Sequence, residues 1–228
     1  GNICEYDVNH EERLATREEL VNAVKNYAAV ITMLNDPIDA DLINQAGPDL
    51  KLIANYGVGY NNIDVQAAKA KGIYVTNTPD VLTDATADTA FTLMFACARR
   101  VIECDNIVRT GSFMWAPKYM LGYDITGRTV GIIGAGRIGA NFGIKAARGF
   151  NMKVLYYSRR NSLHLESVGA QRVGLEELLE RSDFVSLHLP LTDSTRHLIG
   201  AKELAKMKPD GILINTSRGP VVDEKALA

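Results

Sequence analysis

The segment from Gly134 to Gly139 limits the possible folds of this chain more than any other feature. It reads Gly-Ala-Gly-Arg-Ile-Gly, follows the apolar run Val-Gly-Ile-Ile and opens an amphipathic stretch over 136–150. Between a strand and a helix, a GxGxxG pattern has separable physical roles. Gly134 permits the tight turn, Gly136 lets a pyrophosphate approach the backbone, and Gly139 lets the helix lie close to the strand. The alternative reading is a plain glycine turn in an α/β fold.

The first turn of the helix that follows predicts a site for phosphates. Unpaired N–H groups and the positive end of the helix dipole both favour an anion there. Arg137 lies inside the turn and can add a charge-assisted contact. The residues expected to bind a dinucleotide here are Gly134, Gly136, Arg137, Ile138 and Gly139.

Short apolar runs alternate with amphipathic stretches along the 228 residues, which is typical of βαβ units and parallel sheets. Strands are predicted at 28–33, 51–56, 73–77, 128–134, 153–158, 183–189 and 211–217. Helices are predicted after a capping box at Thr16 and Glu19, and then at 39–45, 64–72, 84–110, 136–150, 175–182, 201–207 and near the C-terminal end. The long helix over 84–110 is apolar around much of its circumference, which indicates burial against another domain or subunit.

Composition excludes several classes of function. A formal net charge of −2 gives no long-range attraction to nucleic acid or to an anionic membrane, and no apolar stretch is long enough to span a bilayer. The three cysteines, Cys4, Cys97 and Cys104, form no CxxC pair and have no accompanying cluster of histidine or carboxylate. We therefore expect reduced thiols, a cytoplasmic location and no metal site.

The residues after the next predicted strand distinguish two nicotinamide cofactors. A site for NAD usually offers a carboxylate there to the ribose 2′-OH, whereas this chain has Ser158, Arg159 and Arg160. A hydroxyl and two guanidiniums can bind a 2′-phosphate, which a carboxylate would repel. The sequence therefore predicts NADP as the preferred cofactor, with NAD as the alternative. The alternative interpretation is that the two arginines are solvated residues beyond the end of a strand and have no role in binding.

Several longer segments, in order, resemble the D-isomer-specific 2-hydroxyacid dehydrogenases, and among them the glyoxylate/hydroxypyruvate reductases. The matching segments are NYGVGYNNID, NTPDVLTDATAD, GRTVGIIGAGRIG, HLPLTDSTRHLI and NTSRGPVVDE, at 55–64, 77–88, 127–139, 188–199 and 215–224. The resemblance implies two α/β domains, a substrate-binding domain at 1–76 and a dinucleotide-binding domain at 77–228, with the active site in the cleft between them. It also implies hydride transfer between the cofactor and a small 2-keto or 2-hydroxy acid, such as glyoxylate or hydroxypyruvate.

The resemblance assigns roles to individual residues. Arg218 matches the catalytic arginine, a fixed cation that can hold the substrate carboxylate and stabilise the forming oxyanion. Val58 and Gly59 match backbone donors to that carboxylate. Leu189, Pro190, Thr195 and Thr216 are expected to line the cofactor. The segment around 84–122 is expected to form a homodimer, and Trp115 within it either limits substrate size in the partner's site or anchors the interface.

Two expectations concern what the chain lacks. The family also uses a glutamate and a histidine that lie further along the chain than Arg218, and its substrate-binding domain begins with a strand and a helix that this sequence lacks. The chain is therefore expected to be truncated at both ends. We expect these 228 residues by themselves to aggregate or to turn over little. Of the four histidines, His188 ends a strand near the expected nicotinamide site, but its His-Leu-Pro context matches a family position that is not the proton donor.

Two other functions remain open from the sequence. A dinucleotide-sensing protein, similar to the corepressors built on the same fold, would bind cofactor and peptide without turnover. A dehydrogenase for lactate or phosphoglycerate is the other, although a phosphorylated substrate would need further cationic groups.

Overall fold

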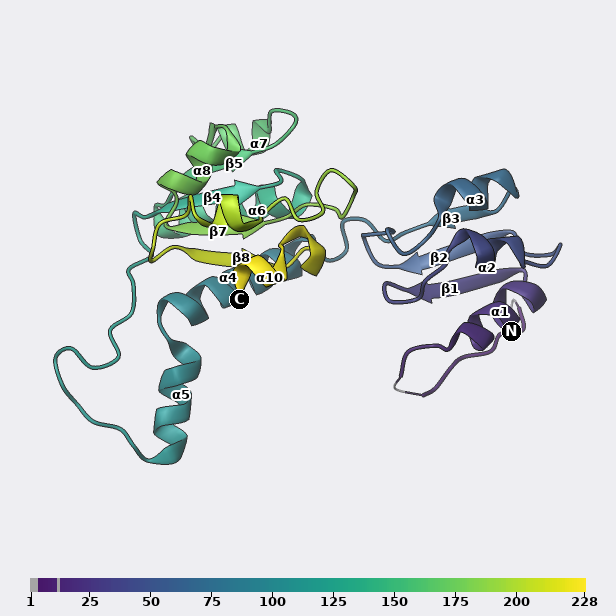
Figure 1. The fold of residues 1–228 in the computed structure, drawn as a ribbon, viewed down its shortest axis with the longest axis horizontal. Helices are drawn as coiled ribbons and strands as arrows, with labels where there is room; N and C mark the ends of the chain where they lie inside the picture. Colours follow the sequence, from purple (N-terminus) through teal and green to yellow (C-terminus); the bar gives the residue numbers. More distant parts are fainter. Residues whose placement is uncertain (1–3, 12) are drawn as a thin grey trace. The chain divides into compact units, whose positions relative to one another are not determined.

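The computed structural model describes residues 4–11 and 13–228, and contacts divide the chain into two compact units, Gly1–Asp80 and Val81–Ala228. Each unit contains its own parallel β-sheet with helices against it (Figure 1). The predicted α/β fold with two parallel sheets is therefore confirmed.

The first unit is a three-stranded sheet in the order β1-β2-β3, with every pair parallel. Its elements are α1 (Arg17–Asn26), β1 (Ala29–Met33), α2 (Ala40–Asn44), β2 (Leu52–Tyr56), α3 (Val65–Ala70) and β3 (Tyr74–Thr76). Each helix begins at a polar N-cap whose side chain accepts a backbone N–H: Thr16, Asp39 and Asp64. The predicted capping box of Thr16 and Glu19 is present in both directions.

The second unit is a five-stranded parallel sheet in the order β6-β5-β4-β7-β8. The strands are β4 (Thr129–Ile133), β5 (Lys153–Tyr157), β6 (Gln171–Arg172), β7 (Phe184–Leu187) and β8 (Ile212–Asn215). The chain builds outward from β4 in one direction through β5 and β6, and then returns to the other side of β4 with β7 and β8. Ligands of such sheets bind beyond the carboxyl ends of the strands where this order reverses, which here is between β4 and β7.

The second unit also contains helices. They are α4 (Thr83–Ala98), α5 (Val101–Thr110), α6 (Arg137–Phe150), α7 (Leu163–Glu166), α8 (Leu175–Arg181), α9 (Ala201–Leu204) and α10 (Glu224–Leu227), with a 3₁₀ turn η1 (Gly219–Val221). One hydrophobic cluster joins α4 and α6 to the strands, and Phe91, Phe142 and Tyr156 are among its members. A second cluster joins α8 and η1 to the strands, with Leu178, Leu187 and Val221.

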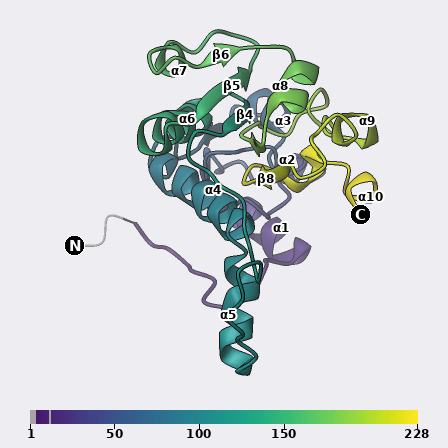
Figure 2. The same cartoon turned by 90° about the vertical axis from the view of Figure 1, so that its left-hand side faces the viewer.

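The prediction of one continuous helix over 84–110 is wrong. The chain turns at Arg100, which has a left-handed backbone with φ 54°, and this residue separates α4 from α5. Helix α4 contacts α6 and β8 of its own unit, and Phe91 and Met94 are buried there. Helix α5 contains no buried residue, and Figures 1 and 2 show it extending away from the sheet of its unit.

Within residues 4–11 and 13–228, no helix has the length and apolar character needed to cross a membrane. The same residues contain no group of three or more histidine, cysteine or carboxylate side chains that could hold a metal ion.

Candidate active site

The glycine turn after β4 has the geometry that the sequence predicts. Gly134 is buried with φ +101°, and a Cβ there would lie 2.5 Å from the His188 carbonyl oxygen. At Gly139 a Cβ would lie 2.1 Å from the Gly134 carbonyl oxygen, so only glycine lets α6 come this close to the turn. Gly136 differs, because a Cβ there would have no atom within 4 Å. Its backbone therefore faces open space that a ligand can enter.

Helix α6 begins directly at this open position. Gly136 is its N-cap, and no side chain caps the helix. Arg137 is exposed and Ile138 is half-buried in the first turn. The 14-residue helix thus presents the positive end of its dipole next to the open backbone of Gly136. This arrangement suits a pyrophosphate.

The loop after β7 lies next to the glycine turn. Its Leu189 side chain would be 3.0 Å from a Cβ at Gly134. The hydroxyl of Thr195 donates to the Pro190 carbonyl oxygen at 2.7 Å and accepts the Thr192 N–H at 2.8 Å. Thr195 therefore fixes the turn that follows Pro190.

His188 joins β7 to this loop. Its Nε2 lies 2.9 Å from the Ser186 Oγ, and its ring contacts Phe142 with centroids 5.4 Å apart. Burial lowers the pKa of His188 to about 4, so the ring is neutral at neutral pH. A neutral imidazole bonded to a serine is a poor proton donor, which agrees with the expectation that another histidine serves the family in that role.

The turn after β5 carries the three residues expected at the adenosine ribose. Ser158 is half-buried, and Arg159 and Arg160 are exposed. The carbonyl oxygens of Ser158 and Arg159 accept hydrogen bonds from the guanidinium of Arg172 in β6. Sequence reasoning missed Arg172, because β6 is two residues long and gives no periodic signal.

Arg218 follows β8 in a turn that Asn215 holds. The Asn215 Oδ1 accepts from both the N–H and the hydroxyl of Ser217, at 2.9 and 2.7 Å, and its Nδ2 donates to the Arg218 carbonyl oxygen at 2.9 Å. The Arg218 guanidinium donates to the Ser217 carbonyl oxygen at 2.8 Å. Among the described residues, the buried Thr216 Oγ1 has no hydrogen-bond partner in the protein. Asn215 was inside a matching segment, but sequence reasoning gave it no role.

In the first unit, the loop after β2 is fixed through its carbonyl groups. Asn77 Nδ2 donates to the Val58 carbonyl oxygen at 2.8 Å, and Asn55 Nδ2 donates to the Gly59 carbonyl oxygen at 2.7 Å. The buried Thr32 hydroxyl in turn donates to the Asn55 Oδ1 at 2.9 Å. Among the described residues, the N–H groups of Val58 and Gly59 have no protein acceptor. Two adjacent donors, in a loop held by the buried Asn55 and the half-buried Asn77, suit an anion such as a carboxylate.

The candidate residues thus form separate groups in the structure. The carboxyl ends of β4, β5, β7 and β8 share one edge of the second sheet, and they carry the glycine turn, Ser158–Arg160, Leu189 and Arg218. Val58 and Gly59 belong to the first unit. Trp115, in the loop after α5, has 82% of its surface exposed.

The order of the second sheet and the glycine turn at its switch point define a Rossmann-type dinucleotide-binding protein. The open backbone at Gly136 and the uncapped start of α6 fit the pyrophosphate of a nicotinamide dinucleotide. A family model described as the NAD-binding domain of D-isomer specific 2-hydroxyacid dehydrogenases matches residues 91–228. The chain belongs to the D-isomer specific 2-hydroxyacid dehydrogenase family, as the sequence predicted, and is an NAD(P)-dependent oxidoreductase.

Known proteins are similar over nearly the whole chain. A glyoxylate reductase of Korarchaeum cryptofilum is 52% identical over 227 residues, which cover 98% of this chain and 68% of that protein. The crystal structure of a glyoxylate reductase from Paecilomyes thermophila has a TM-score of 0.83 and 39% identity, and the match covers 92% of this chain and 66% of the other. An acyclic imino acid reductase, solved with NADPH and D-Arg, has a TM-score of 0.85 and 32% identity over 93% of this chain and 67% of the other.

Proposed function

We propose that this protein reduces glyoxylate, or a similarly small 2-keto acid such as hydroxypyruvate, to the corresponding D-2-hydroxy acid. The similarity to glyoxylate reductases at about half of all positions supports the substrate class. The glycine turn between β4 and α6 is the structural observation on which the proposal depends, because it provides the dinucleotide site. Relatives named as reductases do not favour the corepressor-like alternative.

The family resemblance suggests the roles of the chain's own residues, and their geometry supports them. When bound, the reduced nicotinamide supplies a hydride to the carbonyl carbon of the keto acid. The N–H groups of Val58 and Gly59 bind the substrate carboxylate, since Asn77 and Asn55 hold the carbonyls of that loop. Arg218, held by the Asn215 turn, holds the keto acid and stabilises the negative charge that develops on its carbonyl oxygen. A general acid completes the reaction.

We also propose NADPH as the preferred cofactor. The turn after β5 offers the Ser158 hydroxyl and two exposed guanidiniums, and the chain carries no carboxylate within that triplet. Each guanidinium can bind a phosphate through two parallel hydrogen bonds. A cytoplasmic location is part of this proposal, because Cys4, Cys97 and Cys104 are free thiols in the structure.

Steady-state kinetics of the whole protein with glyoxylate test the proposed function. We expect kcat/KM to be higher with NADPH than with NADH, and we expect Arg218→Gln to lower kcat by about a hundredfold or more. Arg218→Lys keeps the charge and loses the planar fork, so it should recover only part of the activity. Dinucleotide binding without reduction of glyoxylate, hydroxypyruvate or pyruvate would contradict the proposal and favour a binding protein.

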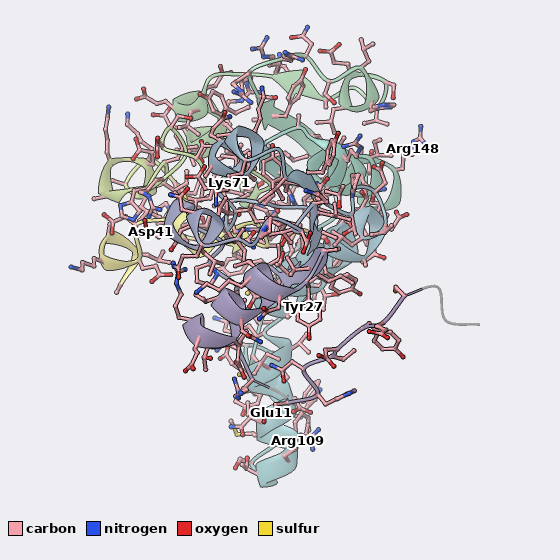
Figure 3. The ribbon with its side chains drawn as sticks, turned by 90° about the vertical axis from the view of Figure 1, so that its right-hand side faces the viewer. Glu11, Tyr27, Asp41, Lys71, Arg109 and Arg148 are labelled. Carbon is pink, nitrogen blue, oxygen red and sulfur yellow. The ribbon has the colours of Figure 1, made fainter. Side chains whose placement is uncertain are left out.

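We propose that residues 101–123, here called the arm, form a homodimer contact. The arm comprises α5 and the loop after it, and its large apolar side chains Ile102, Val108, Phe113, Trp115 and Leu121 are each more than 60% exposed. Arg109, labelled in Figure 3, marks the lower end of α5. An apolar hollow lined by Phe91, Phe95, Phe150 and the Arg148 labelled in the same figure also opens on α4 and α6. Exposed apolar surfaces of this kind mark protein contacts, and a second copy of the chain is the proposed occupant.

A further inference from the structure

The turn after β5 is held from two neighbouring strands. Strands β5 and β6 are parallel, and Tyr156 and Arg172 are partners in their register, so both side chains leave the same face of the sheet. Tyr156 reaches one end of the turn and Arg172 reaches the other. Adjacent positions on two strands therefore set the course of residues 158–162.

Arg172 uses three of its donors on this turn. Its Nε donates to the Ser158 carbonyl oxygen at 3.1 Å and its Nη2 to the Arg159 carbonyl oxygen at 3.2 Å. Its Nη1 donates to the Asn161 Oδ1 at 2.7 Å. A guanidinium is a rigid planar fork, and these contacts direct it at the backbone of the turn.

Tyr156 fixes the other end. Its side chain is fully buried, and its hydroxyl donates to Glu166 Oε1 at 2.6 Å while accepting the Ser162 N–H at 3.2 Å. Burial and the neighbouring Glu166 carboxylate both raise the pKa of Tyr156, so its proton stays in place. Held at both ends, residues 158–162 have little freedom, and the exposed Arg159 and Arg160 extend from a fixed backbone.

We infer that Arg172 is a positioning residue for cofactor selection, which orients Ser158, Arg159 and Arg160 toward the 2′-phosphate of NADPH. This inference rests on the proposed NADPH preference. A ligand gains affinity when the groups that bind it are already ordered, because less conformational entropy is lost on binding. Without Arg172, two carbonyl oxygens of the turn lose their hydrogen-bond donor. Arg159 and Arg160 then belong to a more mobile segment before the cofactor binds.

Binding titrations of the whole protein with the reduced cofactors, NADPH and NADH, test this inference. We expect Arg172→Gln to raise the Kd for NADPH by about tenfold and to leave the Kd for NADH within about twofold, because the 2′-OH does not need the arginines. Arg172→Lys keeps the charge but cannot bridge the turn, so it should behave like Arg172→Gln. The matched control is Arg181→Gln. The exposed Arg181 donates hydrogen bonds to Glu177 and to Gln171, which precedes Arg172 in β6, but has none to the turn.

Each other outcome overturns the inference in a distinguishable way. Equal losses for both cofactors in Arg172→Gln would show a general structural role. Normal NADPH binding by Arg172→Lys would show that only the charge matters. The double variant Arg159→Gln/Arg160→Gln could lose the preference for NADPH over NADH while Arg172→Gln keeps it. That result would overturn the positioning role of Arg172 and leave the cofactor proposal intact. A wild-type chain without NADPH preference would overturn both.

Discussion

At the scale of single residues, the three glycines of one turn have three different roles. Gly134 needs its positive φ, Gly139 needs the absence of a Cβ beside the Gly134 carbonyl, and at Gly136 an added Cβ would meet only open space. The first two requirements come from the fold. The third has no cause within the described protein, so the open space at Gly136 is the feature that points to a ligand.

Two alanine substitutions distinguish a glycine required by the fold from a glycine required for ligand binding. Gly139→Ala should lower the free energy of unfolding by about 1–3 kcal/mol, because its Cβ would overlap a backbone oxygen. Gly136→Ala should leave the melting temperature nearly unchanged and raise the Kd for NADPH. Thermal melts and cofactor titrations of both variants measure the difference. A Gly136→Ala variant that binds NADPH normally would contradict a close approach of the pyrophosphate.

The asparagines behind the substrate loop lead to a second prediction. Asn77→Asp replaces the donor to the Val58 carbonyl with an anion, so the loop shifts and the site repels a carboxylate. We expect KM for glyoxylate to rise by about tenfold, with little change in the Kd for NADPH. Asn35→Asp, an exposed change in the same unit, controls for added charge. Equal kinetics for the two variants would argue against carboxylate binding by this loop.

At the scale of elements, hydrophobic periodicity and capping predicted most strands and helices. The failures have physical reasons. The long apolar segment at 84–110 contains no proline and no glycine, so nothing in its composition marks the break at Arg100. The short elements α7 and β6 contain too few residues to show a period. For the site, motifs located the ligand-facing turns, whereas Asn215, Asn77 and Arg172 act through contacts that only the fold creates.

Asp183 joins strands at the base of the second sheet and provides a test of stability. Its carboxylate accepts the Thr129 N–H at 2.8 Å and pairs with Lys208 at 2.7 Å. Burial raises the pKa of Asp183, but Lys208 and the Thr129 N–H lower it more, so the pKa lies below its ordinary value. The charged form therefore stabilises the fold above about pH 4, and this contribution is lost as the pH falls through the lowered pKa of the folded state.

We expect Asp183→Asn to lower the free energy of unfolding by about 1–2 kcal/mol at pH 7. The difference from wild type should shrink below about pH 4, where the unfolded chain begins to bind a proton at Asp183 while the folded carboxylate stays charged to lower pH. Denaturant unfolding at several pH values measures both. Asp193→Asn, an exposed carboxylate, is the control. A difference that stays constant down to pH 2 would show that the charge of Asp183 is not the cause.

At the scale of the whole molecule, the arm is the segment whose exposed apolar side chains are not covered by its own unit. Helix α4 is accounted for by its contacts with α6 and β8, whereas α5 has no buried residue. A protein gains nothing by exposing several large apolar side chains in one segment, unless another surface covers them. The arm is therefore the segment through which assembly is expected.

Ile102→Glu tests this assembly. Ile102 is 73% exposed, so a charge there should leave the fold intact and weaken a dimer that buries it. Size-exclusion chromatography with light scattering should show the wild type as a dimer and the variant shifted toward the monomer. Leu163→Glu, at an equally exposed position on α7, should remain a dimer. A monomeric wild type, or two variants with the same mass, would refute the role of the arm.

We propose that the turn from Gly134 to Gly139 holds the diphosphate of a nicotinamide dinucleotide, with Ser158–Arg160 at the adenosine ribose. A crystal structure of the protein with NADPH tests it most directly. We expect pyrophosphate density within hydrogen-bond distance of the first N–H groups of α6, and the 2′-phosphate beside Arg159 and Arg160. NADPH bound elsewhere, or a 2′-phosphate directed into solvent away from those arginines, would contradict it.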